Sequence, residues 1–179
     1  MHNKFPFIFT FISDFKEDKI LKLNKNIGII FRNYDENFNK NKILKIKKFC
    51  KKNKRKFYLA NNIKLAINLD LDGVYIPSFN KSLEIKKYNI KNNFLIMGSA
   101  HNFREINIKN KQNVDLIFIS PLFKTKKYKK ILGIIKFNIL SKLTKKKIIA
   151  LGGINTRNIK QLKMININGY SAITHFQMN

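Results

Sequence analysis

The stretch KIIALGGINTRNI, residues 147–159, carries the strongest local signal in this chain of 179 residues. Its apolar run ends at two adjacent glycines, Gly152 and Gly153, although the chain has only seven glycines. Glycine after a strand lets backbone N–H groups approach an anion closely, and a helix that starts there adds unpaired donors and a positive dipole end. The alternative is a tight turn that requires positive φ, with Asn155 or Thr156 as the helix cap.

The same pattern recurs along the chain: a short apolar run is followed by a segment of helical period. One such segment, NKILKIKKFCKKN, places Ile43, Ile46 and Phe49 on one helix face. Strands that alternate with helices imply parallel pairing, because each crossover must carry the chain back to the same end. The expected strands are FIFTFIS from Phe7, IGIIFR from Ile27, KFYLA from Lys56, GVYI from Gly73, FLIMGS from Phe94, DLIFIS from Asp115, KIIALGG from Lys147 and GYSAIT from Gly169.

Eight such units predict an α/β fold, a small closed (β/α)8 TIM barrel that takes residues 1–179 as a single domain. An open flavodoxin-like sheet is the alternative, but it needs only five or six strands. The chain is shorter than the roughly 200–250 residues usual for a barrel. We therefore expect a trimmed first helix within EDKILKLNK, residues 17–25, and no eighth helix after the last strand.

Composition narrows the class of protein. No stretch reaches the ~18 uncharged apolar residues of a spanning helix, and the N-terminal run lacks the basic region and cleavage site of a signal peptide. A single cysteine, Cys50, excludes an internal disulfide and a cysteine metal site. These features predict a cytoplasmic protein.

The charge is strongly positive, with 37 Lys and Arg against 10 Asp and Glu, a formal net charge of +27. One interpretation is nucleic-acid binding, in which clustered basic residues displace counterions from phosphates. The excess is mostly lysine, however, and it is spread over every predicted helix and loop, which favours compositional drift. The charge should still steer anionic small substrates toward the protein.

In a barrel of this kind the chemistry gathers at the carboxyl ends of the strands. Ser99 and His101 lie two residues apart at one such end, so they are expected to share a face and offer a hydroxyl and a proton-transferring ring to one ligand. The alternative is packing or loop capping. No grouping of His, Asp and Glu has convincing metal-site spacing. The polar strand ends are Arg32–Asp35, Ala60–Asn62, Pro77–Ser78, Ser99–His101, Ser120–Thr125, Gly152–Asn155 and Thr174–His175.

Together these strand ends resemble the thiamine-phosphate synthase family, which includes related thiazole tautomerases. The resemblance covers about residues 27–175 and is carried by IIFRNYD, ANNIKLAINLDLDGVYIP, GSAHN, DLIFISPLFKT and IALGGIN. It implies the (β/α)8 fold. It also implies a transferase of thiamine biosynthesis that uses magnesium, joins hydroxymethylpyrimidine pyrophosphate to thiazole phosphate and releases pyrophosphate.

The resemblance further implies roles for individual residues. Ser99 matches a catalytic serine near the reacting pyrophosphate, and His101 matches the proton-transferring histidine of the tautomerase-like branch. Arg32 matches an arginine that contacts the pyrophosphate-bearing substrate. The other implied substrate-binding residues are Asn61, Thr125, Lys127, the phosphate-cup glycines Gly152 and Gly153, and Ile173 and Thr174, which close the cup.

The magnesium-binding half departs from the family pattern. Where the family has Asn-Asp after the third strand, this chain has Ala60-Asn61, and where it has Gly-Gln-x-Asp after the fourth, this chain has Pro77-Ser78-Phe79-Asn80. The positions of the metal-binding aspartates are therefore Asn61 and Asn80, and an amide lacks the charge that a hard cation prefers. Tyr34 stands where the family has a lysine.

Three functions stay open. The first is the synthase, with lysines of residues 124–130 helping to neutralise pyrophosphate. The second is a tautomerase-like isomerase that uses His101 and needs no metal, and the third is a non-catalytic binder of phosphorylated ligands. The expected partners are phosphorylated thiazole and pyrimidine compounds, without membrane or nucleic acid, and the incomplete helix ring leaves room for a homo-oligomer contact beside the last strand.

Overall fold

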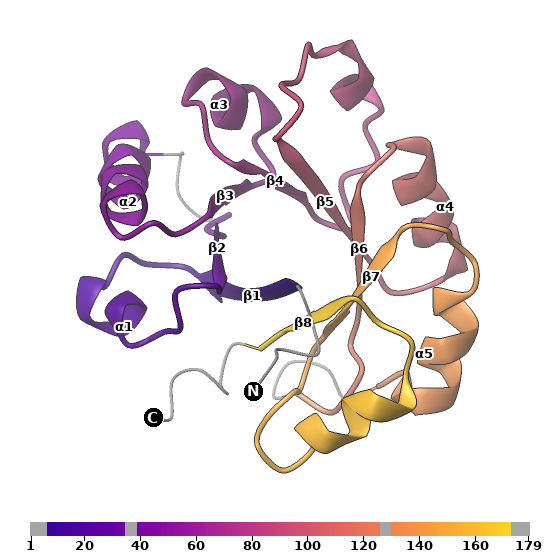
Figure 1. The fold of residues 1–179 in the computed structure, drawn as a ribbon. Helices are drawn as coiled ribbons and strands as arrows, with labels where there is room; N and C mark the ends of the chain where they lie inside the picture. Colours follow the sequence, from indigo (N-terminus) through magenta and orange to yellow (C-terminus); the bar gives the residue numbers. More distant parts are fainter. Residues whose placement is uncertain (1–6, 35–38, 126–129, 173–179) are drawn as a thin grey trace.

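The structure, a computed structural model, describes residues 7–34, 39–125 and 130–172. Eight parallel strands in sequential order form a closed barrel, in which the first strand pairs with the last (Figure 1). Closure confirms the predicted barrel and excludes the open sheet. The strands are β1 (Phe7–Ile12), β2 (Gly28–Phe31), β3 (Phe57–Ala60), β4 (Gly73–Ile76), β5 (Leu95–Ala100), β6 (Leu116–Ile119), β7 (Lys147–Leu151) and β8 (Gly169–Ser171).

Each strand coincides with one of the apolar runs in the sequence. Strands β2, β3, β4 and β6 are buried along their whole length, as expected where both faces of a strand are covered. Alternate residues of β6 serve two cores: Leu116 and Phe118 belong to the cluster inside the barrel, whereas Ile117 and Ile119 belong to the cluster between barrel and helices.

The helices surround the barrel on its outside (Figure 1). The first helix has five residues, which confirms that it is trimmed. The connections after β4 and β7 carry short 3-10 helices in place of α-helices, and each contributes one buried residue, Ile85 and Leu162. The segment after Ala172 lies outside the described residues, and with it the prediction that no eighth helix follows. The helices are α1 (Glu17–Leu21), α2 (Lys40–Lys52), α3 (Ile63–Asn68), η1 (Glu84–Lys87), α4 (Phe103–Lys111), α5 (Gly133–Ser141) and η2 (Ile159–Met164).

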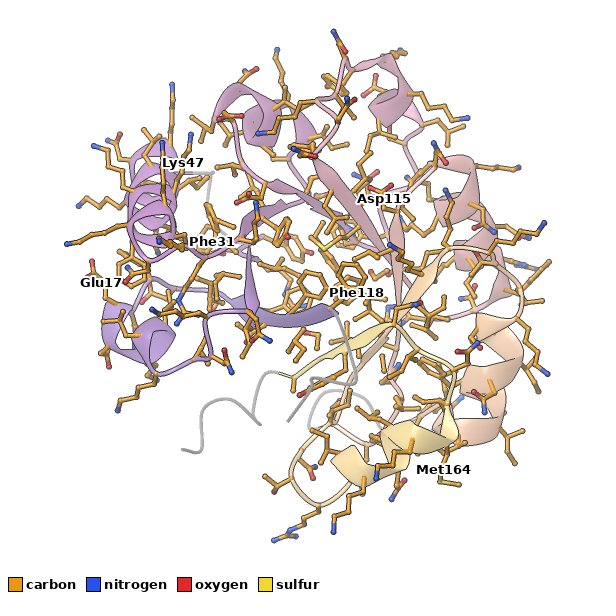
Figure 2. All side chains as sticks on the ribbon, in the orientation of Figure 1. Glu17, Phe31, Lys47, Asp115, Phe118 and Met164 are labelled. Atoms are coloured by element: carbon orange, nitrogen blue, oxygen red, sulfur yellow. The ribbon has the colours of Figure 1, made fainter. Side chains whose placement is uncertain are left out.

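Aromatic side chains fill the barrel. The ring centroid of Phe118 lies 5.3 Å from that of Phe9, 6.1 Å from that of Phe11 and 5.4 Å from that of Tyr75, in tilted or edge-to-face geometry. Aromatic pairs prefer such arrangements over a face-to-face sandwich. Figure 2 shows Phe118 in the middle of the barrel. Because the interior is a packed core, a ligand site must lie at one end of the barrel.

None of the helices in the described part of the chain has the length and apolar character needed to cross a bilayer.

Candidate active site at the carboxyl end of the barrel

The parallel barrel brings the polar strand ends to one rim. Every strand runs in the same direction, so every loop that follows a strand starts at the same end of the molecule. The predicted residues that are described and follow strand ends there are Arg32 after β2, Asn61 after β3, Asn80 after β4, Ser99 and His101 at the end of β5, Thr125 after β6, and Gly152 and Gly153 after β7. Lys127, Ile173 and Thr174 lie outside the described residues.

Arg32 is placed over the aromatic core at this rim. Its guanidinium carbon lies 4.5 Å from the ring centroid of Phe11, and its backbone N–H donates to the carbonyl of Ile12 at 2.8 Å. The charge therefore sits on the face of a buried ring, a contact that aromatic quadrupoles favour. Nearby, the rings of Tyr34 and Phe79 meet edge to face at 5.4 Å, and both side chains are exposed.

Asn61 and Asn80 come together, but as a bonded pair of amides. The Asn80 side chain donates from Nδ2 to Oδ1 of Asn61 at 2.8 Å, and its own Oδ1 accepts the N–H of Ser82 at 3.0 Å. Asn61 adopts a positive φ of 60°, a conformation that asparagine tolerates better than most residues, and its N–H donates to the carbonyl of Tyr75.

This pair does not fit the magnesium site that the sequence resemblance implies. Both amide oxygens already accept hydrogen bonds, and neither carries the negative charge that a hard cation prefers. The described residues also include no cluster of three or more His, Cys, Asp or Glu side chains suited to a metal ion. We therefore derive no step of a reaction through a metal at Asn61 and Asn80.

His101 is held by a partner that the sequence analysis missed. Its Nδ1 lies 2.8 Å from the carbonyl oxygen of Ser120 and 3.1 Å from the hydroxyl of the same residue. A carbonyl can only accept, so this bond assigns the hydrogen of the neutral ring to Nδ1 and leaves Nε2 as the basic nitrogen. Ser99 is buried at the end of β5. The sequence feature that could have pointed to Ser120 is its position at the end of the sixth apolar run, DLIFIS.

A capping motif at the start of α4 positions the segment that carries His101. Asn102 accepts the N–H of Glu105 at 3.0 Å, and the Glu105 carboxylate accepts from the backbone N–H of His101 at 2.7 Å and from the Asn102 amide at 3.0 Å. The reciprocal bonds resemble a capping box, shifted by one residue. The local sequence Asn-Phe-Arg-Glu thus sets the direction in which the chain leaves β5.

The double glycine forms a tight turn that packs against the loop after β6. Gly152 and Gly153 have φ of 98° and 70°, and a Cβ atom on Gly153 would lie 2.5 Å from the carbonyl oxygen of Lys124. Two backbone bonds join the loops, from the N–H of Leu122 to Leu151 and from the N–H of Phe123 to Gly152. The turn interpretation of the glycines is therefore confirmed, and the loop is closed too tightly for any side chain at Gly153.

Asparagine side chains hold this turn from within. The carbonyl of Gly153 accepts from the amides of Asn155 at 3.2 Å and Asn158 at 2.8 Å, and the N–H of Asn155 donates to the Asn158 side chain at 2.8 Å. The residue at the N-cap of η2 is Asn158, whose side chain makes no cap bond, so the prediction of Asn155 or Thr156 as the helix cap is wrong. Among the described residues no hydrogen bond engages the N–H of Gly153 or Ile154. The two groups are suitable donors for an anion.

Lys109 is a buried charge that sequence reasoning missed. It lies on α4 and is fully buried, and its ammonium donates to the carbonyls of Pro77 and Asn80 and to the side-chain oxygen of Gln112, at 2.8–2.9 Å. Burial lowers the pKa of Lys109 to about 8, and the nearby Glu105 carboxylate opposes that shift. The helical period alone would have suggested an apolar residue at this position.

The lowered pKa of Lys109 makes a prediction about stability. Between pH 8 and 10.5 the unfolded chain holds a proton on Lys109 that the folded chain has lost, so the free energy of unfolding should rise with pH across this window. For the whole shift the rise is up to roughly 3 kcal/mol. Urea unfolding of the wild type and of Lys109→Met at several pH values measures this rise. The other lysines are common to both proteins, so the difference between the two proteins isolates the contribution of Lys109. A pH-independent difference between the two proteins would contradict the prediction.

Comparisons with known proteins point to one family. A family model described as thiamine monophosphate synthase matches residues 23–176. The thiamine-phosphate synthase of Pelagibacter ubique is 31% identical over 188 aligned positions, which cover 99% of this chain and 86% of that protein. The thiamine-phosphate synthase of Prochlorococcus marinus is 31% identical over 133 positions, and the match covers 73% of this chain but only 38% of that protein.

A solved structure supports the fold independently of close sequence similarity. The thiamine phosphate pyrophosphorylase from Pyrococcus furiosus superposes with a TM-score of 0.75 at 18% identity, over 96% of this chain and 87% of that one. At this level of identity the superposition establishes the shared barrel.

Proposed function

The chain belongs to the thiamine monophosphate synthase family, and from this premise we propose that it condenses hydroxymethylpyrimidine pyrophosphate with thiazole phosphate to form thiamine phosphate. The observation that carries the proposal is the pairing of two anion-binding features on one rim. Arg32 follows β2, and the Gly152–Gly153 turn follows β7. Two phosphorylated substrates need two such features.

The reaction breaks the bond between the pyrimidine methylene carbon and the pyrophosphate oxygen, and it forms a bond from that carbon to the thiazole nitrogen. Negative charge develops on the departing pyrophosphate, so catalysis requires a fixed positive charge at that point. Arg32 supplies such a charge, and the buried Ser99 offers a hydroxyl close to the same rim. The enzyme's other task is to hold the two reactants in line.

The double-glycine turn is suited to the phosphate of the thiazole. The N–H groups of Gly153 and Ile154 are not engaged in hydrogen bonds among the described residues, and the absence of a side chain at Gly153 lets the turn lie against the loop after β6. Backbone donors of this kind are a common way to bind phosphate in barrels, after the seventh and eighth strands. The surplus of basic residues, 37 against 10, favours the approach of both anionic substrates.

The test is an assay of purified protein with both substrates, with and without Mg²⁺, followed by detection of thiamine phosphate. Formation above the background rate supports the synthase, and its absence at high enzyme concentration rejects it. Tight binding of thiazole phosphate without turnover would indicate the non-catalytic binder. Retention on DNA that falls steeply with salt would indicate the nucleic-acid alternative.

His101→Gln separates the synthase from the tautomerase-like alternative. Glutamine retains a donor toward the carbonyl of Ser120 but cannot transfer protons as imidazole does. For a synthase we expect kcat to stay within about tenfold of the wild type, whereas a tautomerase would lose on the order of 100-fold or more. Steady-state kinetics with each substrate set measures the difference. His101→Ala is the companion variant, since it also removes the bond to Ser120.

A further inference from the structure

Lys109 is a fully buried charged residue to which the proposed reaction assigns no role. A buried charge is costly unless its surroundings satisfy it, and here the three acceptors of the ammonium are all neutral: two backbone carbonyls and one amide. The nearest acid on the same helix, Glu105, is instead bonded to His101 and Asn102. An apolar residue at this helix position would avoid the cost of burying a charge. The presence of the ammonium therefore indicates that it has a role.

The surrounding residues are matched to this lysine. Gly98 of β5 leaves the space through which the lysine stem passes, because a Cβ atom there would lie 2.7 Å from Cδ of Lys109. Gln112, also buried, donates from Nε2 to the carbonyls of Asn80 at 3.0 Å and Ser82 at 2.8 Å. Lys109 and Gln112 together therefore make four bonds to the loop of residues 77–82, which connects β4 to η1.

This loop carries one member of the amide pair at the rim. The side chain of Asn80 reaches Asn61 across the ends of β3 and β4, while the backbone carbonyl of the same Asn80 is held by Lys109 from behind. The pair does not fit a magnesium ion, as described above. A fixed cation nevertheless lies behind the loop, in the form of the lysine ammonium.

We infer that Lys109 is a positioning residue for the proposed synthase reaction: it holds the 77–82 loop, and thereby the Asn61–Asn80 pair, in place at the pyrophosphate side of the rim without a bound metal ion. The inference rests on the proposed function for its catalytic consequence. Its structural part, a loop ordered by the ammonium, stands on the bonds of Lys109 and Gln112.

The first test is amide hydrogen exchange in the loop. In Lys109→Met, which keeps the length of the stem, exchange over residues 78–84 should become about tenfold faster or more, while the β-strands keep their protection. In the wild type, addition of Mg²⁺ or EDTA should not change the exchange of this loop. Lys111→Met is the matched control, because Lys111 lies on the same helix and is exposed.

The second test compares the effect of Lys109→Met on the two substrates. Lys109→Met should raise KM for the pyrimidine pyrophosphate by about tenfold or more and leave the Kd of thiazole phosphate within about twofold. A lysine with only a structural role would lower the folded fraction without this selective change. If Lys109→Met does not fold, Gln112→Leu keeps the lysine, removes two of the four loop bonds and should show the same effects in weaker form.

The two tests of the role of Lys109 can fail separately from the proposed synthase function. Wild-type loop protection that is lost in EDTA, or unchanged protection in both Lys109→Met and Gln112→Leu, would overturn the inference. Faster loop exchange with an unchanged KM would overturn its catalytic part. If the wild type has no synthase activity, the proposed function fails, and the exchange measurement still decides whether the ammonium orders the loop.

Discussion

Replacement of Gly153 by alanine is expected to raise the Kd of thiazole phosphate on the order of 100-fold, equivalent to about 2.7 kcal/mol, with a similar loss of kcat/KM. A Cβ atom at this position would lie 2.5 Å from the carbonyl oxygen of Lys124 and 2.6 Å from that of Phe123, and both are backbone atoms that cannot rotate away. The loop after β6 must move, and the turn that presents the Gly153 and Ile154 N–H groups must open.

The substitution should also lower the free energy of unfolding by about 2–3 kcal/mol, from the clash together with the positive φ of 70°. Calorimetric titration with thiazole phosphate and urea unfolding measure the two effects. Gly133→Ala is the matched control, because Gly133 has a φ of 66° but nothing within 4 Å of its Cβ position. If both variants bind thiazole phosphate equally well, the phosphate-binding role of the turn is wrong.

Arg32→Gln is expected to reduce kcat/KM by about 10²–10³-fold, with the loss expressed mainly in kcat and in KM for the pyrimidine pyrophosphate. Glutamine retains a hydrogen-bond donor but removes the charge that lies 4.5 Å from the centre of the Phe11 ring. That charge has no substitute in the Asn61–Asn80 pair, which is neutral.

Binding of thiazole phosphate should be unchanged in Arg32→Gln, because the double-glycine turn follows a different strand. Steady-state kinetics with each substrate varied separately makes the comparison. Lys52→Gln is the charge-matched control, since Lys52 is exposed and ends α2, which leads into the start of β3 at the opposite end of the barrel. A loss shared equally by both variants would mean that overall charge, and not the position of Arg32, governs the rate.

The surplus of lysine and the proposed anion-binding residues should differ in how their effects depend on salt. Surface lysines are expected to affect only the rate at which anionic substrates arrive, and such an effect weakens as ionic strength rises. Arg32 and the Gly153 turn are proposed to act on bound substrate, so the effects of their substitution are expected to persist at high salt. Kinetics at two ionic strengths would therefore separate steering from catalysis in any lysine variant of this chain.

The candidate-site residues that could be predicted from the sequence are those located at or directly after the ends of strands. The strand of residues 147–151 could be predicted to stop at two glycines, and Arg32 and Ser99 could be placed at strand ends, because an apolar run and the residue after it are local features. The short 3-10 helices after β4 and β7 were less predictable, since each depends on a single buried residue, Ile85 or Leu162, and too few apolar positions define a period.

Sequence by itself therefore determined the barrel, the family and the strand ends that meet at one rim, because hydrophobic periodicity and parallel connection are properties of neighbouring residues. Tertiary structure alone decided the contacts across that rim. Lys109 bonds to residues 32 and 29 positions earlier, and His101 bonds to Ser120, 19 positions later. Such pairs depend on how helices and loops pack around the closed barrel. The same packing brings the side chains of Asn61 and Asn80 into a hydrogen bond with each other and places the buried ammonium of Lys109 against the backbone of Asn80.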